Sequence, residues 1–581
     1  MENDECLLRL RLCTRCASRR RRSVDPIVDR RARQLCNLQQ VTFTALTSSN
    51  QIDSHAARFT RPREYRTDAR LPTRYLIDAS LPKMFVAAAR FGRLATAKTP
   101  LLRPRRGVVA VAARQGGRST SSSSSSGGRG RGRGGGRRPN SGDAASVPRQ
   151  RRNFDDAQRA ALEATIEAAT EKARVVVGRG KANMFLDGNP IVYAGAIERI
   201  EGEVKSGDYV CVTDHALAPI ALGFYNDTSS YSVRILTQAW EPRESAEETI
   251  ERRIREAYEL RAAMGLVGND STTCYRLLNS EGDRFSGLNA DVYGDVVVAS
   301  STAAWVEIWR DVILKSFAKV LGDKTEVVWR RDEKMYEAEG IPWDGELVEY
   351  YRAASGESAG DVPGEVRVRE NGIEYAVDMA GGHKTGFYVD QRDNRFAVRE
   401  LSKGKKVLDV CCYTGGFSLN AALGGAESVT AVDSSEAALT VAKRNAELNS
   451  VQDKIEFVRA DAFDFMQDAI DAGGAGSYDV IVLDPPKFAP NKQALKKALP
   501  KYVGLNKRAM TLLRPGGILI TCSCSGAVTQ ERLLTPVVEN AARAAGKSAT
   551  ILSIRGASGD QPIDPAYAFG EYLTVLTAVV R

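Results

Sequence analysis

The stretch KKVLDVCCYTGGFSLNAALGGAESVTAVD, residues 405–433, decides the fold of this chain. Its apolar run 406–410 has the length of a strand buried on both faces. Gly415 then allows a tight turn, because glycine adopts positive φ freely, and we expect a helix from about Phe417. A second apolar run ends in Asp433. The order strand, glycine turn, helix, strand predicts an α/β fold with a doubly wound parallel sheet.

The polar residues of this stretch indicate a nucleoside cofactor. Doubly wound sheets hold ribose hydroxyls with a carboxylate at the carboxyl end of the second strand, which is the position of Asp433. The turn reads D-x-C-C-x-T-G-G from Asp409 and lacks the glycine spacing of the dinucleotide fingerprint. It resembles motif I of class I S-adenosylmethionine-dependent methyltransferases. The alternative is an ordinary parallel-sheet core whose glycines only turn the chain.

Charge is divided unevenly along the 581 residues. Residues 1–142 carry 30 Lys and Arg against 9 Asp and Glu, whereas the rest carry 52 against 63, a net charge of −11. Any nucleic-acid surface on the folded part must therefore be a local patch. No apolar run approaches the length of a membrane span. Ten scattered cysteines and three histidines favour a reducing compartment and no metal site.

We interpret residues 1–142 as a disordered basic region that resembles a transit peptide. The segment 84–142 has no Asp or Glu, and its arginines alternate with Ala, Val, Ser and Thr, which is typical of organelle targeting. The chloroplast is favoured over the mitochondrion, and a cytoplasmic location is expected if this region is not a transit peptide. The serine run 121–126 and the RG repeat 127–138 would contact RNA or form a solvated linker.

Three folded domains are expected after a linker and helix. The segments FLDGNPIVYAGAIE (185–198) and GFYNDTSSYSVRIL (223–236) contain short β-branched runs and turns that suggest a small barrel. They resemble the PUA module, a compact RNA-binding β-barrel. The predicted bounds are 143–174 for the linker and helix, 175–240 for the PUA-like domain, 241–353 for a central α+β domain, 354–365 for a second linker and 366–581 for the last domain.

The run GGHKTGFYVDQRDNR, residues 381–395, combines polar donors with aromatic rings that could stack on a base. Together with the PUA-like segments and the central domain, it resembles the RlmI-like family of ribosomal RNA cytosine methyltransferases over about 175–581. The resemblance implies a Rossmann-like methyltransferase sheet that ends in an antiparallel hairpin, with S-adenosylmethionine as cofactor and RNA, expected to be ribosomal, as partner. The sequence leaves open whether the protein is a monomer or a homodimer.

The fourth and fifth strands of the last domain are predicted to end in the catalytic residues. The fourth ends in D-P-P-K-F, from Asp484 to Phe488, where amino-methylating enzymes of this fold typically follow the prolines with an aromatic ring. Lys487 at that position weakens N-methylation. Carbon 5 of a pyrimidine is a poor nucleophile, so its methylation needs a thiolate that adds to carbon 6. The fifth strand runs into CSCSG, residues 522–526, which supplies such a thiol.

Cys524 is the predicted nucleophile. It lies beyond the apolar run, where a thiolate forms more easily than at Cys522, and in the resembled family the cysteine of S-C-S-G has this role. The alternative is that both cysteines are buried packing residues. Asp484 is expected to hold ring nitrogen 3 of the cytosine, by a proton or a hydrogen bond, while the sequence does not name the base that removes the carbon 5 proton.

The resemblance implies the remaining site residues. Asp461 also fits a helix N-cap. Competing functions are methylation of an amino group of an RNA base or of another acceptor and, more distantly, a nonenzymatic RNA-binding or assembly factor. The implied cofactor-binding residues are Asp409, Tyr413, Gly415, Phe417, Asp433, Ser434, Asp461, Ala462 and Phe463, and the implied substrate-binding residues are Lys384, Arg392, Pro485, Lys487 and Phe488.

Overall fold

The computed structural model describes residues 173–242, 244–341 and 345–581. The predictions for residues 1–142 and most of the linker and helix at 143–174 therefore lie outside the described residues. All described residues belong to one contact-defined unit of the chain. Within these described ranges, no helix is both long and apolar enough to cross a membrane.

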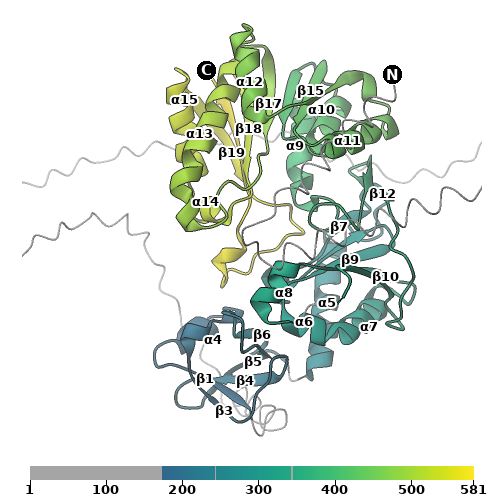
Figure 1. Cartoon of the computed structure of the whole chain (residues 1–581), viewed down its shortest axis with the longest axis vertical. Coiled ribbons are helices and arrows are strands. Elements are labelled where there is room, and N and C mark those ends of the chain that lie inside the picture. The colour runs from purple at the N-terminus through teal and green to yellow at the C-terminus, as the bar shows by residue number, and fades with distance from the viewer. Residues whose placement is uncertain (1–172, 243, 342–344) are drawn as a thin grey trace, which may run out of the picture. The chain divides into compact units, whose positions relative to one another are not determined.

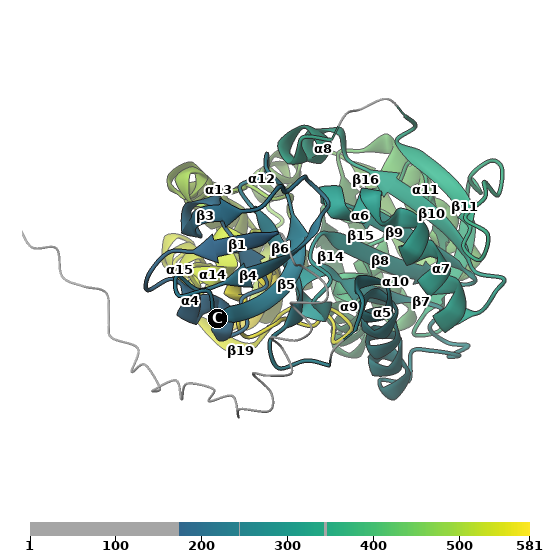
Figure 2. The ribbon, with the colours of Figure 1, turned by 90° about the horizontal axis from the view of Figure 1, so that it is seen from below.

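The first described domain is built on a six-stranded sheet. Its strands are hydrogen-bonded in the order β2–β6–β5–β4–β1–β3, and Figure 2 shows β1, β4, β5 and β6 side by side. Every residue of β6 is buried, because one sheet face covers the domain core and the other packs on the next domain. The elements are β1 (Arg174–Val177), α4 (Ala182–Leu186), β2 (Ile191–Val192), η1 (Ala194–Ala196), β3 (Ile197–Glu201), β4 (Tyr209–Thr213), β5 (Pro219–Tyr225) and β6 (Val233–Gln238).

The central domain packs helices on a five-stranded sheet of order β11–β10–β9–β8–β7. Trp309 separates α6 from α7, and its indole packs against Phe224 with ring centroids 5.1 Å apart and donates to the Gly207 carbonyl at 3.3 Å. The elements are α5 (Ala246–Ala263), β7 (Cys274–Asn279), η2 (Ser280–Asp283), β8 (Leu288–Tyr293), β9 (Val296–Ser301), α6 (Ala304–Ile308), α7 (Arg310–Leu321), β10 (Glu326–Arg331), α8 (Glu333–Glu339) and β11 (Val348–Arg352).

The last domain contains the predicted doubly wound sheet. Its strand order is β16–β15–β14–β17–β18–β20–β19, with β20 antiparallel to both of its neighbours. Helices α9, α10 and α11 cover one face and α12, α13 and α15 the other (Figure 1). This topology confirms the predicted class I methyltransferase sheet with its C-terminal hairpin.

The first strand of the large sheet in the last domain, β14, has the bounds of the predicted apolar run 406–410. A two-stranded sheet, β12 with β13, precedes the large sheet. The elements are β12 (Val366–Glu370), β13 (Ile373–Val377), η3 (Val389–Gln391), α9 (Arg392–Leu401), β14 (Lys406–Val410), α10 (Gly416–Leu423), β15 (Ser428–Asp433), α11 (Glu436–Leu448), η4 (Gln452–Lys454), β16 (Ile455–Arg459), α12 (Ala462–Asp471), β17 (Tyr478–Leu483), η5 (Lys492–Ala494), α13 (Leu495–Leu512), β18 (Leu513–Ser523), α14 (Gly526–Gln530), α15 (Leu534–Ala544), β19 (Ala549–Arg555), η6 (Ala568–Gly570) and β20 (Thr574–Val580).

Strand register determines where the site forms. Val410 at the end of β14 lies opposite Val432 of β15 and Leu483 of β17, and Leu483 lies opposite Thr521 of β18. The residues that follow these four positions therefore reach one level at the carboxyl edge of the sheet, where open α/β sheets bind ligands.

Candidate active site

A cavity of about 820 Å³ opens at this carboxyl edge. Its volume suits a nucleoside-sized ligand together with part of a second one. The structure brings most of the predicted site residues together on its wall. Those that line the cavity are Lys384, Tyr413, Phe417, Asp433, Ser434, Asp461, Ala462, Phe463, Asp484, Pro485, Lys487, Phe488 and Cys524.

Three predicted residues do not line the cavity. Asp409 is fully buried and accepts a hydrogen bond from Ser418 Oγ at 2.6 Å. Gly415 precedes α10 with a φ of 83°, a backbone conformation that glycine tolerates. The Arg392 guanidinium is bound to Asp560 instead of facing the cavity. The cofactor roles of Asp409 and Gly415 and the substrate role of Arg392 stay predictions.

One wall of the cavity contains the Asp433 carboxylate, which can accept hydrogen bonds, and a turn with strained backbone angles. The Asp433 carboxylate is fixed by the amides of Tyr413 and Ser435, both at 2.9 Å. Cys411 and Tyr413 have φ values of 63° and 51°, which is uncommon for residues other than glycine and typical of ligand-binding turns. The turn that follows β14 therefore lies on the cavity wall with its backbone in this uncommon conformation.

The second wall supplies an apolar surface. Asp461 caps α12, because its Oδ1 accepts from the amides of Phe463 at 2.7 Å and Asp464 at 3.3 Å. The N-cap role weighed from the sequence is thus present. The residues that follow the cap, Ala462 and Phe463, line the cavity. They give this wall an apolar surface, whereas Asp433 gives the first wall a carboxylate. Carboxylate acceptors for ribose hydroxyls beside an aromatic surface for a purine fit the adenosine part of S-adenosylmethionine.

The catalytic corner contains Asp484 and Cys524. Asp484 accepts a hydrogen bond from Gln391 Nε2 at 3.1 Å. Burial, followed by the negative charge of Asp390, raises the pKa of Asp484 to about 6. Burial and the charge of Asp484 also raise the pKa of the Cys524 thiol, while Lys487 and Lys384 act in the opposite direction. Carboxylate, thiol and two cations therefore influence one another in this corner.

Cysteine environments distinguish Cys524 from the other thiols of the cavity. Cys522 is fully buried, whereas Cys524 is partly exposed and lines the cavity. Cys411 and Cys412 also line it, but the groups that act on the pKa of Cys411 after burial are all carboxylates. Thiolates form more readily beside cations. Among the cysteines on the cavity wall, Cys524 is distinguished by two cations, Lys487 and Lys384, that act to lower its pKa against the larger effect of burial.

Sequence reasoning missed three residues of this corner. Asp390 and Gln391 lie in the quoted run 381–395, where their position in front of a helix was a usable signal. Tyr572 precedes β20, and its hydroxyl donates to Asp390 Oδ2 at 2.6 Å, a contact across 182 residues that no local pattern marks. Lys384 donates to the same oxygen and lies 4.4 Å from the ring centroid of Tyr388.

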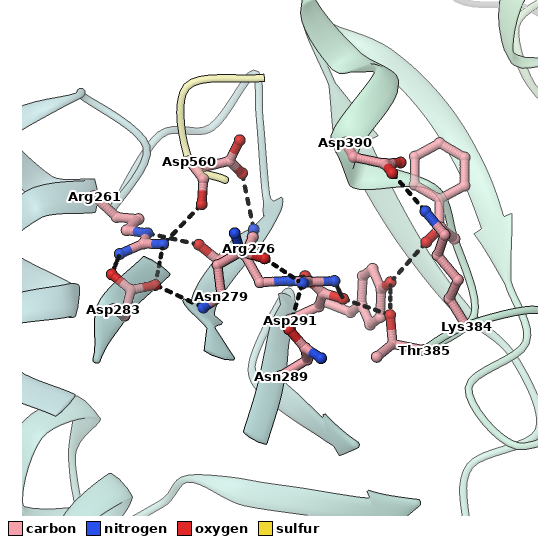
Figure 3. Close-up of polar contacts among 12 residues, drawn as sticks. Arg261, Arg276, Asn279, Asp283, Asn289, Asp291, Lys384, Thr385, Asp390 and Asp560 are labelled. Atoms are coloured by element: carbon pink, nitrogen blue, oxygen red, sulfur yellow. Dashed lines mark hydrogen bonds and ion pairs between the residues drawn. The ribbon is translucent and has the colours of Figure 1, made fainter. Parts of the chain in front are cut away.

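The central domain holds the loop that carries Lys384. Arg276 of β7 binds Asp291 of β8 through two hydrogen bonds of 2.6 and 3.0 Å. Thr385, next to Lys384, donates to Asp291 and lies 2.9 Å from the Tyr293 hydroxyl. Figure 3 shows this row of contacts from Asp560 through Arg276 and Asp291 to Thr385 and Lys384. The position of Lys384 therefore depends on a neighbouring domain.

Comparisons with known proteins agree with this geometry. The family model for S-adenosylmethionine-dependent methyltransferases matches residues 347–569, and the model for PUA-like domains matches residues 175–238. Fold and site together define an S-adenosylmethionine-dependent methyltransferase with a PUA-like domain. The match to a PUA-like model confirms the domain class predicted from the segments 185–198 and 223–236.

Curated relatives identify the family. The chain is 35% identical over 407 residues to Ribosomal RNA large subunit methyltransferase I of Klebsiella pneumoniae (strain 342), covering 69% of this chain and 96% of the relative. It is 36% identical over 417 residues to the protein of that name from Aeromonas hydrophila, covering 70% and 100%. The chain therefore belongs to the Ribosomal RNA large subunit methyltransferase I family, as the resemblance to RlmI-like proteins implied.

Solved structures show the same fold. A crystal structure of the methyltransferase SMU.776 complexed with SAH superposes with a TM-score of 0.58 at 21% identity, covering 70% of this chain and 99% of that one. A SAM-dependent methyltransferase from Streptococcus mutans gives the same values. At this identity the likeness concerns the fold alone.

Proposed function

We propose that this protein methylates carbon 5 of a cytosine in organellar large-subunit ribosomal RNA through a covalent adduct on Cys524. The observation that carries the proposal is the position of Cys524 on the cavity wall, beside Asp484 and under the influence of Lys384 and Lys487. The names of the curated relatives support ribosomal RNA as the substrate class. The PUA-like domain supports binding of RNA that flanks the target.

The chain's own groups supply the covalent steps. The Cys524 thiol gives its proton to the Asp484 carboxylate, and the thiolate adds to carbon 6 of the cytosine. Asp484 then holds this proton at ring nitrogen 3, where negative charge develops. Its pKa of about 6 suits both roles, since the carboxyl ionises just below neutral pH. S-adenosylmethionine supplies the methyl group to the activated carbon 5.

The target base must leave its stack to enter the cavity. Unstacking and unpairing cost a few kcal/mol in a duplex and less in a loop or bulge. We therefore expect an irregular, partly single-stranded RNA segment as substrate. Methylation of an exocyclic amino group is the competing chemistry, and it does not require Cys524.

Nucleoside mass spectrometry tests the proposal. Organellar large-subunit rRNA transcripts are incubated with S-adenosylmethionine and the full chain, its Cys524→Ala variant or its Cys522→Ala variant. New 5-methylcytidine with the parent and with Cys522→Ala, but not with Cys524→Ala, is the expected result. A methylated purine, or 5-methylcytidine that persists without Cys524, would overturn the proposed chemistry.

We also propose that residues 84–142 direct the protein to an organelle, with the chloroplast favoured. The support is the absence of Asp and Glu from this segment, which lies outside the described residues. A fluorescent protein fused to residues 84–142 should enter the organelle. Cytosolic fluorescence would contradict the proposal.

A further inference from the structure

Helix α13 and its flanking segments form a strongly basic stretch beside the cavity. Between Asp484 and Glu531 the chain contains eight Lys and Arg and no Asp or Glu, although residues 143–581 have a net charge of −11. A random surface segment of this acidic part of the chain would carry both positive and negative residues. The absence of acidic residues over this length therefore points to a local anionic partner.

The cations of α13 share one side of the helix. At about 100° per residue, Lys497, Lys501 and Arg508 lie within about 40° of one another, and Lys496 and Lys507 lie within about 20° of each other on the adjoining strip. The four lysines are exposed and Arg508 is partly buried. Buried residues such as Tyr502 and Leu505 occupy the opposite side. The cations thus form a continuous face directed to solvent.

This face reaches the cavity. Lys501 Nζ lies 5.8 Å from the ring centroid of Phe488, and the Arg508 guanidinium lies 5.5 Å from that of Phe463. Both rings line the cavity, and exposed Lys487 lies on the same wall. A chain of phosphates that crosses α13 would therefore lead directly to the place where a base enters.

We propose that this basic face, Lys487 with Lys496, Lys497, Lys501 and Lys507, binds the phosphates of the RNA strand that carries the target base. The inference rests on the proposed function and assigns the path of the strand. A base displaced from its stack leaves a strained backbone outside the cavity, and that backbone needs neutralising contacts. Lysine is suited to this sequence-independent role, since it meets phosphate as a point charge.

Salt-dependent RNA binding tests this assignment. The full chain with Lys496→Gln, Lys497→Gln and Lys501→Gln is compared with the parent and with a matched control, Lys315→Gln, Lys324→Gln and Lys403→Gln, which removes three exposed lysines elsewhere. We expect the α13 variant to lower RNA affinity about tenfold or more near 0.15 M salt. The slope of log K against log salt should fall by about 2, at roughly 0.7 per lost contact to a single strand.

The outcomes separate this proposal from the proposed function. The variant should keep its affinity for S-adenosylmethionine and its kcat at saturating RNA, with the loss confined to KM. An unchanged slope, or an equal loss in the control, would overturn the role of α13 while the parent still bound RNA. A parent that binds no RNA in a salt-dependent way would instead overturn the proposed substrate.

A second observation concerns the unassigned base. Asp390 is 3% exposed, lines the cavity, and accepts contacts from Lys384 and Tyr572 on Oδ2 alone. Its Oδ1 is buried and has no hydrogen-bond partner in the described part of the chain. Such orphaned carboxylate oxygens are rare and costly in native proteins. Because Asp390 is one of the residues that line the cavity, its unpartnered oxygen has an acceptor position left for a group that binds there.

The surroundings of Asp390 keep it ionised and fixed. Burial alone would raise its pKa, but Lys384 and the Tyr572 hydroxyl bring the pKa below its ordinary value. The Asp390 carbonyl accepts from the amide of Ser558 at 2.9 Å and from its hydroxyl at 3.0 Å, which anchors the backbone. Asp390 is thus a fixed, ionised carboxylate among the residues that line the cavity.

The geometry points to Asp390 as the group that accepts the carbon 5 proton, with Lys384 and Tyr572 as positioning residues. This step also rests on the proposed function. The bond between carbon 5 and its hydrogen breaks, and its electron pair forms the carbon 5–carbon 6 double bond. The carbon 6–sulfur bond breaks, Cys524 leaves as a thiolate, and the proton ends on Asp390 Oδ1.

Trapping of the adduct tests this role. With RNA and methyl-labelled S-adenosylmethionine, Asp390→Asn should lose turnover about 10²-fold or more and accumulate a methylated RNA–protein complex that survives a denaturing gel. The same variant with Cys524→Ala should form none. Normal turnover in Asp390→Asn, or lost turnover without adduct in a variant that still binds the cofactor, would overturn the assignment.

A second variant, with a smaller change, tests the same role if Asp390→Asn does not fold. Tyr572→Phe keeps the carboxylate and removes one of its two donors. It should slow turnover about tenfold and accumulate a smaller amount of the complex. Slow turnover of Tyr572→Phe without any adduct would likewise overturn the proposal, whereas a parent that makes no 5-methylcytidine would overturn the proposed function.

Discussion

Asp560 and Arg392 form a two-point ion pair in which both nitrogen–oxygen distances are 2.9 Å, although Asp560 is 0% exposed and Arg392 only 6%. Asp560 lies between β19 and β20, and Arg392 begins α9. The same carboxylate accepts from the Arg276 amide at 2.8 Å, and the Asp560 carbonyl accepts from Arg261 Nη2 at 2.7 Å. One loop of the last domain is thereby bound to its own α9 and to the central domain.

Removal of this carboxylate should destabilise the protein strongly. Asp560→Ala removes the two-point partner of the buried Arg392 guanidinium, which keeps a contact to the exposed Asp393 at 3.2 Å, and breaking a buried ion pair typically costs about 3–5 kcal/mol. The measurement is the midpoint of thermal unfolding of the full chain. Asp361→Ala, at an exposed aspartate, is the control and should unfold within about 0.5 kcal/mol of the parent. Equal midpoints for both variants would mean that the pair contributes nothing.

Loss of the Thr385 hydroxyl should slow the reaction from a distance. Lys384 has a φ of 55°, so its backbone is strained and needs support from the neighbouring Thr385. Thr385→Val removes the donor to Asp291 while nearly keeping the volume. We expect a kcat about tenfold lower with little change in KM for RNA.

The conservative variant separates positioning from packing. Thr385→Ser keeps the hydroxyl that contacts Asp291 and Tyr293, and it should restore most of the kcat. Steady-state kinetics with RNA of the parent and both variants provide the test. A Thr385→Ser variant as slow as Thr385→Val would show that the methyl group, and not the hydrogen bond, matters.

The sheet and its catalytic edge could be predicted because buried parallel strands read as continuous apolar runs. The predicted strand 406–410 agrees with β14 to the residue, and β17 ends directly before Asp484, where the fourth strand was predicted to end. The joint position of Asp484 and Cys524 followed from parallel topology, which brings strand ends to one edge. These inferences needed only local pattern and general topology.

What local sequence could not show comes from contacts distant in sequence. The substrate role implied for Arg392 stays a prediction, but its ion-pair partner Asp560 lies 168 residues away and no local pattern marks it. Trp309, between α6 and α7, contacts Gly207 and Phe224 of the first described domain, about 100 residues earlier in the chain. Burial of a charge or an indole by a distant segment is decided by the tertiary structure.

The rate of methylation should rise with pH through about 6. In the proposed mechanism, the active form holds one proton between Asp484 and Cys524, so a second proton on this pair stops the reaction. The raised pKa of Asp484, about 6, places that inhibitory protonation just below neutral pH. A profile of kcat/KM between pH 5 and 8 measures it.

Asp484→Asn provides the control for this profile. The variant cannot take up the thiol proton, so kcat/KM should fall about 10²-fold or more and lose the rise near pH 6. Asn491→Asp, at an exposed position outside the corner, should keep the profile of the parent. A rise of unchanged midpoint in Asp484→Asn would assign the titration to another group.

Ionisation of Asp409 should lower the stability of the folded protein as the pH rises, whereas a carboxylate held in an ion pair raises it. Burial raises the pKa of Asp409 to about 7, with the Ser418 hydroxyl acting in the other direction. In the unfolded chain an aspartate ionises near pH 4. Between these values the folded state binds more protons than the unfolded state, so stability falls as pH rises from about 4 to 7.

Asp409→Asn removes this titration, and its side chain can still accept a hydrogen bond from Ser418. Thermal unfolding at pH 5 and pH 8 should show a smaller loss of stability at pH 8 for Asp409→Asn than for the parent, whereas Asp453→Asn, at an exposed site, should follow the parent. Parallel losses in all three proteins would mean that Asp409 ionises at its ordinary pKa.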